Sequence, residues 1–144
     1  MPVLLRRFFA GSNLVLRNPD NARELHDMRL EGKRLRFAME AFAPAFGKAF
    51  ARSLKEIRDI LRLMGLIHDC DVSIGILADF LREFEIFNSM QSADEPALAL
   101  RPLRELLSGQ RALRLELFAR LRAALKQREI SALRKRFEKA LDSK

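Results

Sequence analysis

Four side chains that can bind an anion recur about one helical turn apart between residues 26 and 36. They are His26, Arg29, Lys33 and Arg36, and the spacing i, i+3, i+7, i+10 places them on one arc of a helix. Arginine matches phosphate with a planar fork of donors, lysine adds a mobile point charge, and histidine gains charge as the pH falls toward about 6. Like charges on consecutive turns repel by a few tenths of a kcal/mol per pair, a cost that a bound polyanion would remove. The cluster therefore predicts contacts to phosphate oxygens rather than to one small carboxylate.

Two further segments carry cations beside a candidate core. Residues 46–64 and 96–125 are both expected to be helical, and in each the basic side chains fall on an arc next to the apolar stripe. The arc of the first segment contains Lys48, Arg52, Lys55, Arg58 and Arg62, and that of the second contains Arg101, Arg104, Arg111, Arg122 and Lys126.

The same residues also have a simpler interpretation, in which the charged arcs are solvated helix faces. His26 could be a half-buried histidine that donates to a carbonyl. Arg29 and Arg36 could pair with Asp69 or Asp71. For each residue taken singly, this structural interpretation is favoured by the pattern.

The basic residues are unevenly distributed along the chain. Its 144 residues carry a net charge of +8 and a pI near 10.5. Residues 1–68 hold 13 Lys/Arg against 7 Asp/Glu, residues 69–95 hold 1 against 7, and residues 96–144 hold 13 against 5. Because an acidic segment separates two basic ones, a compact fold could bring the basic segments together into a stronger positive surface than the net charge suggests.

Composition excludes several classes of protein. A single cysteine, Cys70, rules out an internal disulfide framework and a cysteine-based zinc site, and it is interpreted as a packing residue. No apolar run approaches the roughly 20 residues of a membrane span, and the apolar run after the paired arginines near the start is too short for a signal peptide. With no Trp or Tyr, a stacking platform for single-stranded nucleic acid is not evident. We expect a cytoplasmic, reducing location.

Strand signals are absent and the apolar period is helical almost throughout. Asn18, Pro19 and Asp20 are expected to open a helix over 20–42, which Pro44 and Gly47 end. Further helices are predicted over 46–64, stopped by Gly65, over 69–88, capped by Asp69 or Asp71, and over 96–125, with a break near Gly109; residues 129–141 continue it or form a short helix of their own. Residues 88–95 form a polar loop. These lengths predict an all-α fold, an antiparallel up-down four-helix bundle of long amphipathic helices occupying residues 20–144 after an N-terminal segment 1–19.

Apolar side chains at helical spacing are the expected core. In the first predicted helix they are Leu25, Met28, Leu35, Met39 and Phe42, in the second Phe50, Leu54, Ile57, Leu61 and Met64, and in the last Leu100, Leu103, Leu107, Leu113, Leu117, Leu121 and Leu125.

Two separated sequence elements resemble the CHAD family, the conserved histidine α-helical domain. The first is LHDMRLEGKRLRFAMEAFAPAFG (25–47), with a His, an Arg three residues later and a Lys-Arg-Leu-Arg run, and the second is LRLMGLIHDCDV (61–72). Together they cover roughly residues 24–77, in the family's order and at a plausible separation. The likeness is closer to the second of the two repeats that family members usually contain, whereas this chain holds one repeat.

The resemblance implies a helical bundle that binds inorganic polyphosphate on a basic surface without catalysing a reaction, and without a cofactor or metal. Carried over by position, the polyanion contacts would include Arg34 besides the cluster at 26–36, and Asp69 and Asp71 would be a structural pair that orients arginines. Either the chain is a fragment, or it is a single-repeat member in which a homodimer replaces the missing repeat; polyphosphate granules are an expected location. With the basic arcs of the other helices, the full set of expected contacts is His26, Arg29, Lys33, Arg34, Arg36, Lys48, Arg52, Lys55, Arg62, Arg104 and Arg111.

Three other functions remain as alternatives. A nucleic-acid-binding helical protein would use the basic last helix, although no helix-turn-helix signature or base-reading set of Asn and Gln is present. An enzyme, either a phosphohydrolase or a metal-dependent one, would use His26, His68, Asp69 and Asp71 as possible ligands. The run from His68 to Asp71 superficially resembles a metal-binding His-Asp pair, but these residues fit helix capping better. A helical protein-interaction module would have no need of the cations.

Overall fold

The computed structural model describes residues 2–18, 20–92, 94–126, 135 and 139. Its elements are α1 (Pro2–Arg17), α2 (Ala22–Phe42), the short 3-10 helix η1 (Ala43–Ala45), α3 (Lys48–Met90) and α4 (Arg101–Lys126). Every element in this part of the chain is helical, so the predicted all-α class is confirmed. None of these helices combines the length and apolar character that a membrane span requires.

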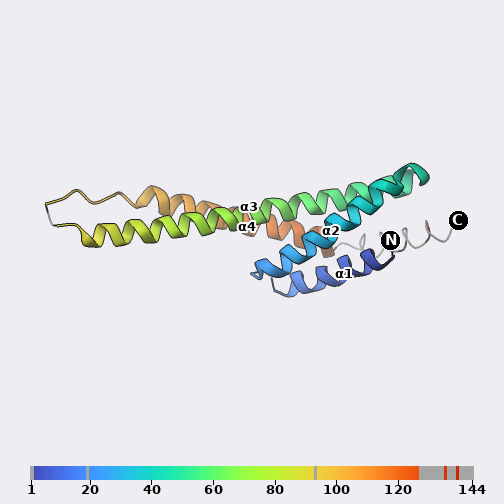
Figure 1. Ribbon diagram of the computed structural model, residues 1–144, viewed down its shortest axis with the longest axis horizontal. Helices are drawn as coiled ribbons and strands as arrows, with labels where there is room; N and C mark the ends of the chain where they lie inside the picture. Colours follow the sequence, from blue (N-terminus) through green and yellow to red (C-terminus); the bar gives the residue numbers. More distant parts are fainter. Residues whose placement is uncertain (1, 19, 93, 127–134, 136–138, 140–144) are drawn as a thin grey trace.

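One helix, α3, dominates the shape of the molecule (Figure 1). Its 43 residues span about 65 Å at 1.5 Å per residue. The helix α4 packs along it, whereas α1 and α2 lie beside only one half of α3, and the other half extends away with α4 as a two-helix hairpin. The antiparallel four-helix bundle stays a prediction, because four helices do not accompany one another along the whole of α3.

The boundaries of α2 follow from local signals. The Asn21 side chain caps its N-terminus, accepting hydrogen bonds from the backbone N–H groups of Arg23 (3.1 Å) and Glu24 (3.2 Å). The N-cap is therefore Asn21, which directly follows the three residues that were expected to open the helix. The helix ends at Phe42, where Pro44 in η1 and Gly47 interrupt the chain as expected.

The prediction of separate helices before and after Gly65 is wrong, since α3 is continuous from Lys48 to Met90. Glycine costs a helix about 1 kcal/mol relative to alanine, and the buried residues Met64 and Ile67 on either side of Gly65 outweigh that cost by packing. The capping role predicted for Asp69 and Asp71 is likewise wrong, because both lie in the middle of the helix. The predicted break near Gly109 does not occur either, and α4 begins at Arg101 instead of near residue 96. The segment 129–141 falls mostly outside the described residues.

The core joins all four helices, including α1, for which no helix was predicted. Phe8 and Val15 of α1 are buried with the stripes of α2, α3 and α4. Most of the predicted core is confirmed as buried, but Phe42 is 53% exposed and Leu113 is 42% exposed. Phe42 ends α2 where no other helix covers it. Whether residues 1–19 form a segment separate from the domain stays a prediction, although their helix contributes to the common core.

Candidate functional site

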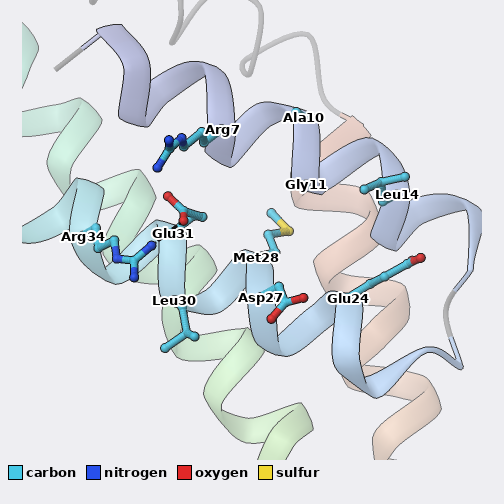
Figure 2. A pocket seen from close by; sticks show the side chains of 10 residues that line it. All are labelled: Arg7, Ala10, Gly11, Leu14, Glu24, Asp27, Met28, Leu30, Glu31 and Arg34. Carbon is cyan, nitrogen blue, oxygen red and sulfur yellow. Dashed lines mark hydrogen bonds and ion pairs between the residues drawn. The ribbon is translucent and has the colours of Figure 1, made fainter.

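The two flanks of α2 carry opposite charges. Toward α1 it presents Glu24, Asp27 and Glu31, which line an open hollow of about 530 Å³ between the two helices (Figure 2). Arg34 lies on the same side, paired with Glu31 at 2.5 Å between Nη1 and Oε1. Three carboxylates line this hollow against two arginines, Arg7 and Arg34, so it lacks the positive excess that a polyanion needs, and Arg34 is separated from the other predicted contacts on α2.

The flank toward α3 is basic. At 100° per residue, His26, Arg29, Lys33 and Arg36 fall within an arc of about 80°. Two contacts show that this arc lies against α3: the ring centroids of His26 and His68 are 6.1 Å apart, and Glu40, on the same arc, pairs with Arg58. His26 is exposed, so the alternative of a half-buried histidine is wrong.

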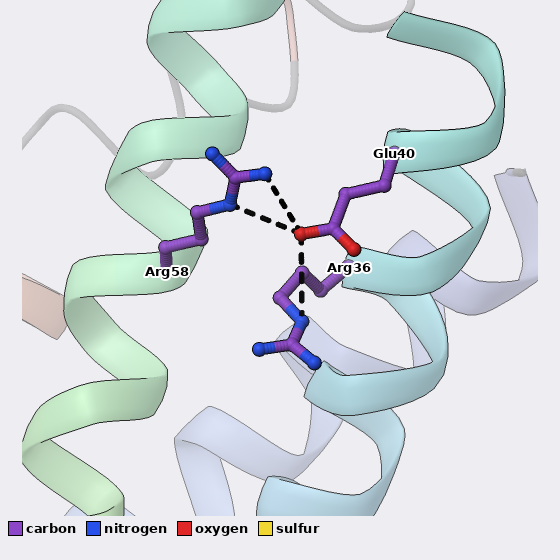
Figure 3. A network of polar contacts seen from close by, with 3 residues as sticks. All are labelled: Arg36, Glu40 and Arg58. Carbon is purple, nitrogen blue, oxygen red and sulfur yellow. Dashed lines mark hydrogen bonds and ion pairs between the residues drawn. The ribbon is translucent and has the colours of Figure 1, made fainter.

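Glu40 holds two arginines of this flank in place (Figure 3). Arg58 of α3 donates to Glu40 Oε1 from Nη2 at 2.8 Å and from Nε at 3.1 Å. Arg36 Nε lies 3.7 Å from the same oxygen, and its guanidinium stacks 4.6 Å from the centroid of the Phe37 ring. The expected pairing of Arg36 with Asp69 or Asp71 is therefore wrong, since a carboxylate four residues along its own helix takes that place.

We call the surface formed along the contact of α2 with α3 the basic seam. It consists of the α2 side chains His26, Arg29, Lys33 and Arg36, the α3 side chains Arg58 and His68, and the carboxylate Glu40; Asp69, next to His68, is exposed within about 20° of Arg58 by helical position. Among the described residues, Arg29 and Lys33 form no ion pair, so their charge is available to a ligand. Arg58 and His68 were absent from the predicted contacts. Arg58 was on the predicted basic arc of residues 46–64, but only the packing of α3 against α2 shows that it, among the cations of that arc, faces α2.

The remaining cations of α3 lie around or beyond the seam. Lys55 and Arg62 are exposed on the arc of α3 that adjoins Arg58, within about 60° of it by helical position. Lys48 and Arg52 belong to the first two turns of α3, past the end of α2. Lys55 and Arg62 therefore flank the seam, Arg62 between Arg58 and His68 along the helix, whereas Lys48 and Arg52 lie beyond its end.

The two predicted contacts on α4 are not brought to the seam. Arg104 lies on the hairpin, where Nη2 is 2.9 Å from Glu85 Oε1. Arg111 lines a shallow hollow beside Asp71 and Arg114. Glu85 and Asp71 lie on the side of α3 that faces α4, so neither Arg104 nor Arg111 belongs to the contact of α2 with α3.

Asp71 orients an arginine, as predicted, but a different one. It accepts a hydrogen bond from Nε of Arg114, whose side chain is 11% exposed, and Arg114 Nη1 lies 3.9 Å from Asp20. The contact ties α4 to α3. Asp69 forms no ion pair within the described part of the chain.

The residues that could serve a metal or a nucleophile are dispersed. In the described ranges no three His, Cys, Asp or Glu side chains gather as a cation site. Cys70 is buried, and desolvation, reinforced by the charges of Asp71 and Asp69, raises the pKa of its thiol. A raised pKa disfavours the thiolate that a nucleophile needs.

Comparison with known families supports the likeness that the two sequence elements suggested. No curated protein and no solved structure matches the chain. A family model described as the CHAD domain matches residues 2–78, a range that begins in α1, contains all of α2 and includes every residue of the basic seam. Because the match covers more than half of the 144 residues, the chain belongs to the CHAD family.

Proposed function

We propose that the chain binds inorganic polyphosphate on the basic seam and catalyses no reaction. The observation that carries the proposal is the alignment of four cationic or titratable side chains of α2 along the contact with α3, where Arg58 and His68 lie opposite them. The CHAD domain is associated with polyphosphate and is generally a non-catalytic binding domain, which is consistent with this arrangement.

The shape of the seam suits a linear polyanion. His26 and Arg36 are ten residues apart on α2 and are therefore separated by about 15 Å along its axis. Several phosphates in a row can each find a donor over that length, and guanidinium groups bind phosphate oxygens in pairs of hydrogen bonds. Arg36 and Arg58 already share one acceptor in Glu40, and a phosphate beside it offers them further acceptor oxygens.

Longer chains would extend past the seam. We propose that Lys55 and Arg62 are the next contacts, that Lys48 and Arg52 follow, and that Arg34, Arg104 and Arg111 contribute only long-range attraction. The proposal also includes a homodimer that doubles the basic surface, a domain of residues 20–144 with its N-terminal segment, and a cytoplasmic location with access to polyphosphate granules.

Titration with polyphosphates of increasing length, at several salt concentrations, tests the proposal. Affinity should rise with chain length until the seam is filled and should fall steeply with salt, as counterion release requires. Equal affinity for a long polyphosphate and for orthophosphate would refute it.

A matched pair of charge reversals locates the site. Lys33→Glu on the seam should weaken binding by about tenfold at low salt and reduce the salt slope by about 1 to 2. Arg101→Glu, an equal change of charge on a side chain that is 87% exposed in the hairpin, should have little effect. Tolerance of both reversals would instead favour a protein-interaction module, and DNA displacing polyphosphate more readily than the reverse would favour nucleic acid as the ligand.

A further inference from the structure

The helix α3 extends well beyond the helix that covers one of its faces. The helices α2 and α3 run antiparallel, and His26, near the N-terminus of α2, lies beside His68 of α3. The N-terminus of α2 is therefore reached before Val72, and α2 does not accompany α3 beyond that residue. By helical position, the arc of α3 beneath α2, which includes Leu54 and Arg58, continues past this point through Val72 and Ile76. No described residue of α1 or α2 lies over the continuation, as Figure 1 shows.

Exposed apolar side chains occupy this continuation and the arc next to it, on which Lys55 and Arg62 lie in the covered half of α3. We call them the apolar stripe: Val72, Ile76, Phe80, Phe84 and Phe87, with Glu83 as the carboxylate among them. The five apolar side chains are between 39% and 51% exposed, and the rings of Phe80 and Phe84 are stacked with centroids 6.2 Å apart. Contiguous exposed apolar surface of this kind marks an interaction site, whereas scattered single residues do not.

The hairpin partner α4 does not cover the stripe. It contacts α3 on a different arc, where Arg104 pairs with Glu85 and Arg114 pairs with Asp71. By helical position these two carboxylates lie more than about 120° from the centre of the stripe. The stripe therefore faces largely away from α4.

We infer that a second copy of this chain packs on the apolar stripe, with the two α3 helices antiparallel about a two-fold axis at Phe80. The spacing of the stripe is symmetric about that residue, since Ile76 and Phe84 lie four residues before and after it, and Val72 and Phe87 lie eight and seven. Antiparallel pairing therefore sets each apolar side chain of one protomer opposite an apolar side chain of the other, as a self-complementary interface requires.

One ion pair reaches the edge of the stripe. Asp79 lies about 80° and Arg82 about 140° from the centre of the stripe by helical position, and the two form an exposed ion pair at 3.2 Å within the chain. In an antiparallel pair centred on Phe80, Asp79 of each protomer is level with Arg82 of the other, so an acid is level with a base and not with a like charge.

The dimensions of the uncovered segment fit the same occupant. From Val72 to Met90 it measures about 27 Å, and the identical segment of a partner fills that length and ends near the first turn of α2. The stripe and Met90 together expose roughly 500 Å². With the flanking charged residues this approaches the roughly 800 Å² per partner of a stable interface.

This inference specifies the interface of the homodimer in the proposed function, and its test omits polyphosphate so that the two can fail separately. Light scattering at about 50 µM should give twice the chain mass of 16.6 kDa. Phe80→Glu, which sets two carboxylates against each other at the axis, should weaken the dimer at least about 100-fold. Leu115→Glu, at a side chain 66% exposed on α4, is the matched control and should leave the dimer intact.

Two further variants keep the inference testable if Phe80→Glu unfolds. Phe80→Cys should be joined to its symmetry mate by a short bismaleimide, and Leu115→Cys should not. Glu83→Leu removes the carboxylate that lies within the stripe and should tighten the dimer several-fold. A monomeric wild type, or a Phe80→Glu dimer as stable as the control, overturns the inference, whereas the polyphosphate titration of the same samples decides the proposed function independently.

Discussion

Substitution of two glycines by alanine, one on α2 and one on the facing helix α3, should change the stability of the fold in opposite directions. A Cβ added to Gly32 would lie 2.7 Å from Leu61 Cδ2 and 2.9 Å from Phe8 Cε2, where ordinary carbon contacts are about 3.5–4.0 Å. A Cβ added to Gly65 would meet nothing within 4 Å. Both residues lie inside helices, so alanine gains helix propensity at both and is accommodated at only one.

The magnitudes follow from these distances. Gly65→Ala should stabilise the fold by about 1 kcal/mol, the difference in helix propensity between the two residues. At Gly32 the neighbours are buried, Phe8 at 0% and Leu61 at 8% exposure, so neither can move freely. Overpacking costs about 1–3 kcal/mol, and contacts of 2.7 Å and 2.9 Å with buried neighbours put Gly32 in the upper part of that range, at about 2–3 kcal/mol; after the same propensity gain this leaves a net loss of about 1–2 kcal/mol.

Urea and thermal unfolding followed by circular dichroism measure both variants against the wild type. The midpoint temperature of thermal unfolding should rise by about 2–4 °C for Gly65→Ala and fall by a similar or larger amount for Gly32→Ala. Both should be measured with Phe80→Glu in the background as well, because dimerisation makes the midpoint depend on concentration. Equal destabilisation by the two substitutions would refute the assignment of Gly32 to a three-helix contact and of Gly65 to open space.

Two other predictions concern single side chains. Glu40→Gln should lower the free energy of unfolding by about 0.5–1 kcal/mol, the range for exposed ion pairs, and should tighten polyphosphate binding about two- to threefold by removing the carboxylate of the seam; weaker binding in the titration would contradict the site. Because burial raises the pKa of the Cys70 thiol, alkylation of the native protein near neutral pH should be at least about tenfold slower than in denaturant. The neutral thiol is the form favoured by folding, so this residue's contribution to stability is full at low pH and declines as the pH rises past the thiol's ordinary range.

The sequence predicted the composition of the seam better than the course of the helices. The spacing of His26, Arg29, Lys33 and Arg36 identified their common arc, because these residues belong to one helix and helical geometry is local. Gly65 was misread as a stop signal, because its local preference is opposed by packing of Met64 and Ile67 against other helices. The buried residues of α1 were missed, since residues 1–19 were assigned to a segment outside the bundle.

Residues that depend on the pairing of two helices were not predictable from spacing alone. Arg58 belongs to the seam because it lies opposite Glu40, eighteen positions away, and Arg104 is excluded because it pairs with Glu85 on the hairpin. All three arginine arcs look alike in sequence. The charges of α2 give the clearest illustration: its acidic flank faces α1 and its basic flank faces α3, and only the packing of the neighbouring helices determines which flank becomes a seam with a second set of cations.

If both proposals hold, the affinity of the dimer for polyphosphate should rise with chain length in two separate steps. Arg62, which lies beside the seam, is 18 residues and therefore about 27 Å along α3 from the two-fold axis at Phe80, so the seams of the two protomers lie about 54 Å apart. That separation is several Debye lengths at physiological salt, so the two sites repel each other little and each should fill independently with short chains. A chain long enough to reach both gains an effective concentration at the second site, which should raise its affinity by at least about 100-fold over the short-chain plateau. In the monomeric variant Phe80→Glu, the affinity for short chains should be unchanged, and the additional gain in affinity for long chains should vanish. If long chains still bind this variant more tightly, they are held along one protomer, past Lys55 and Arg62, and not across two.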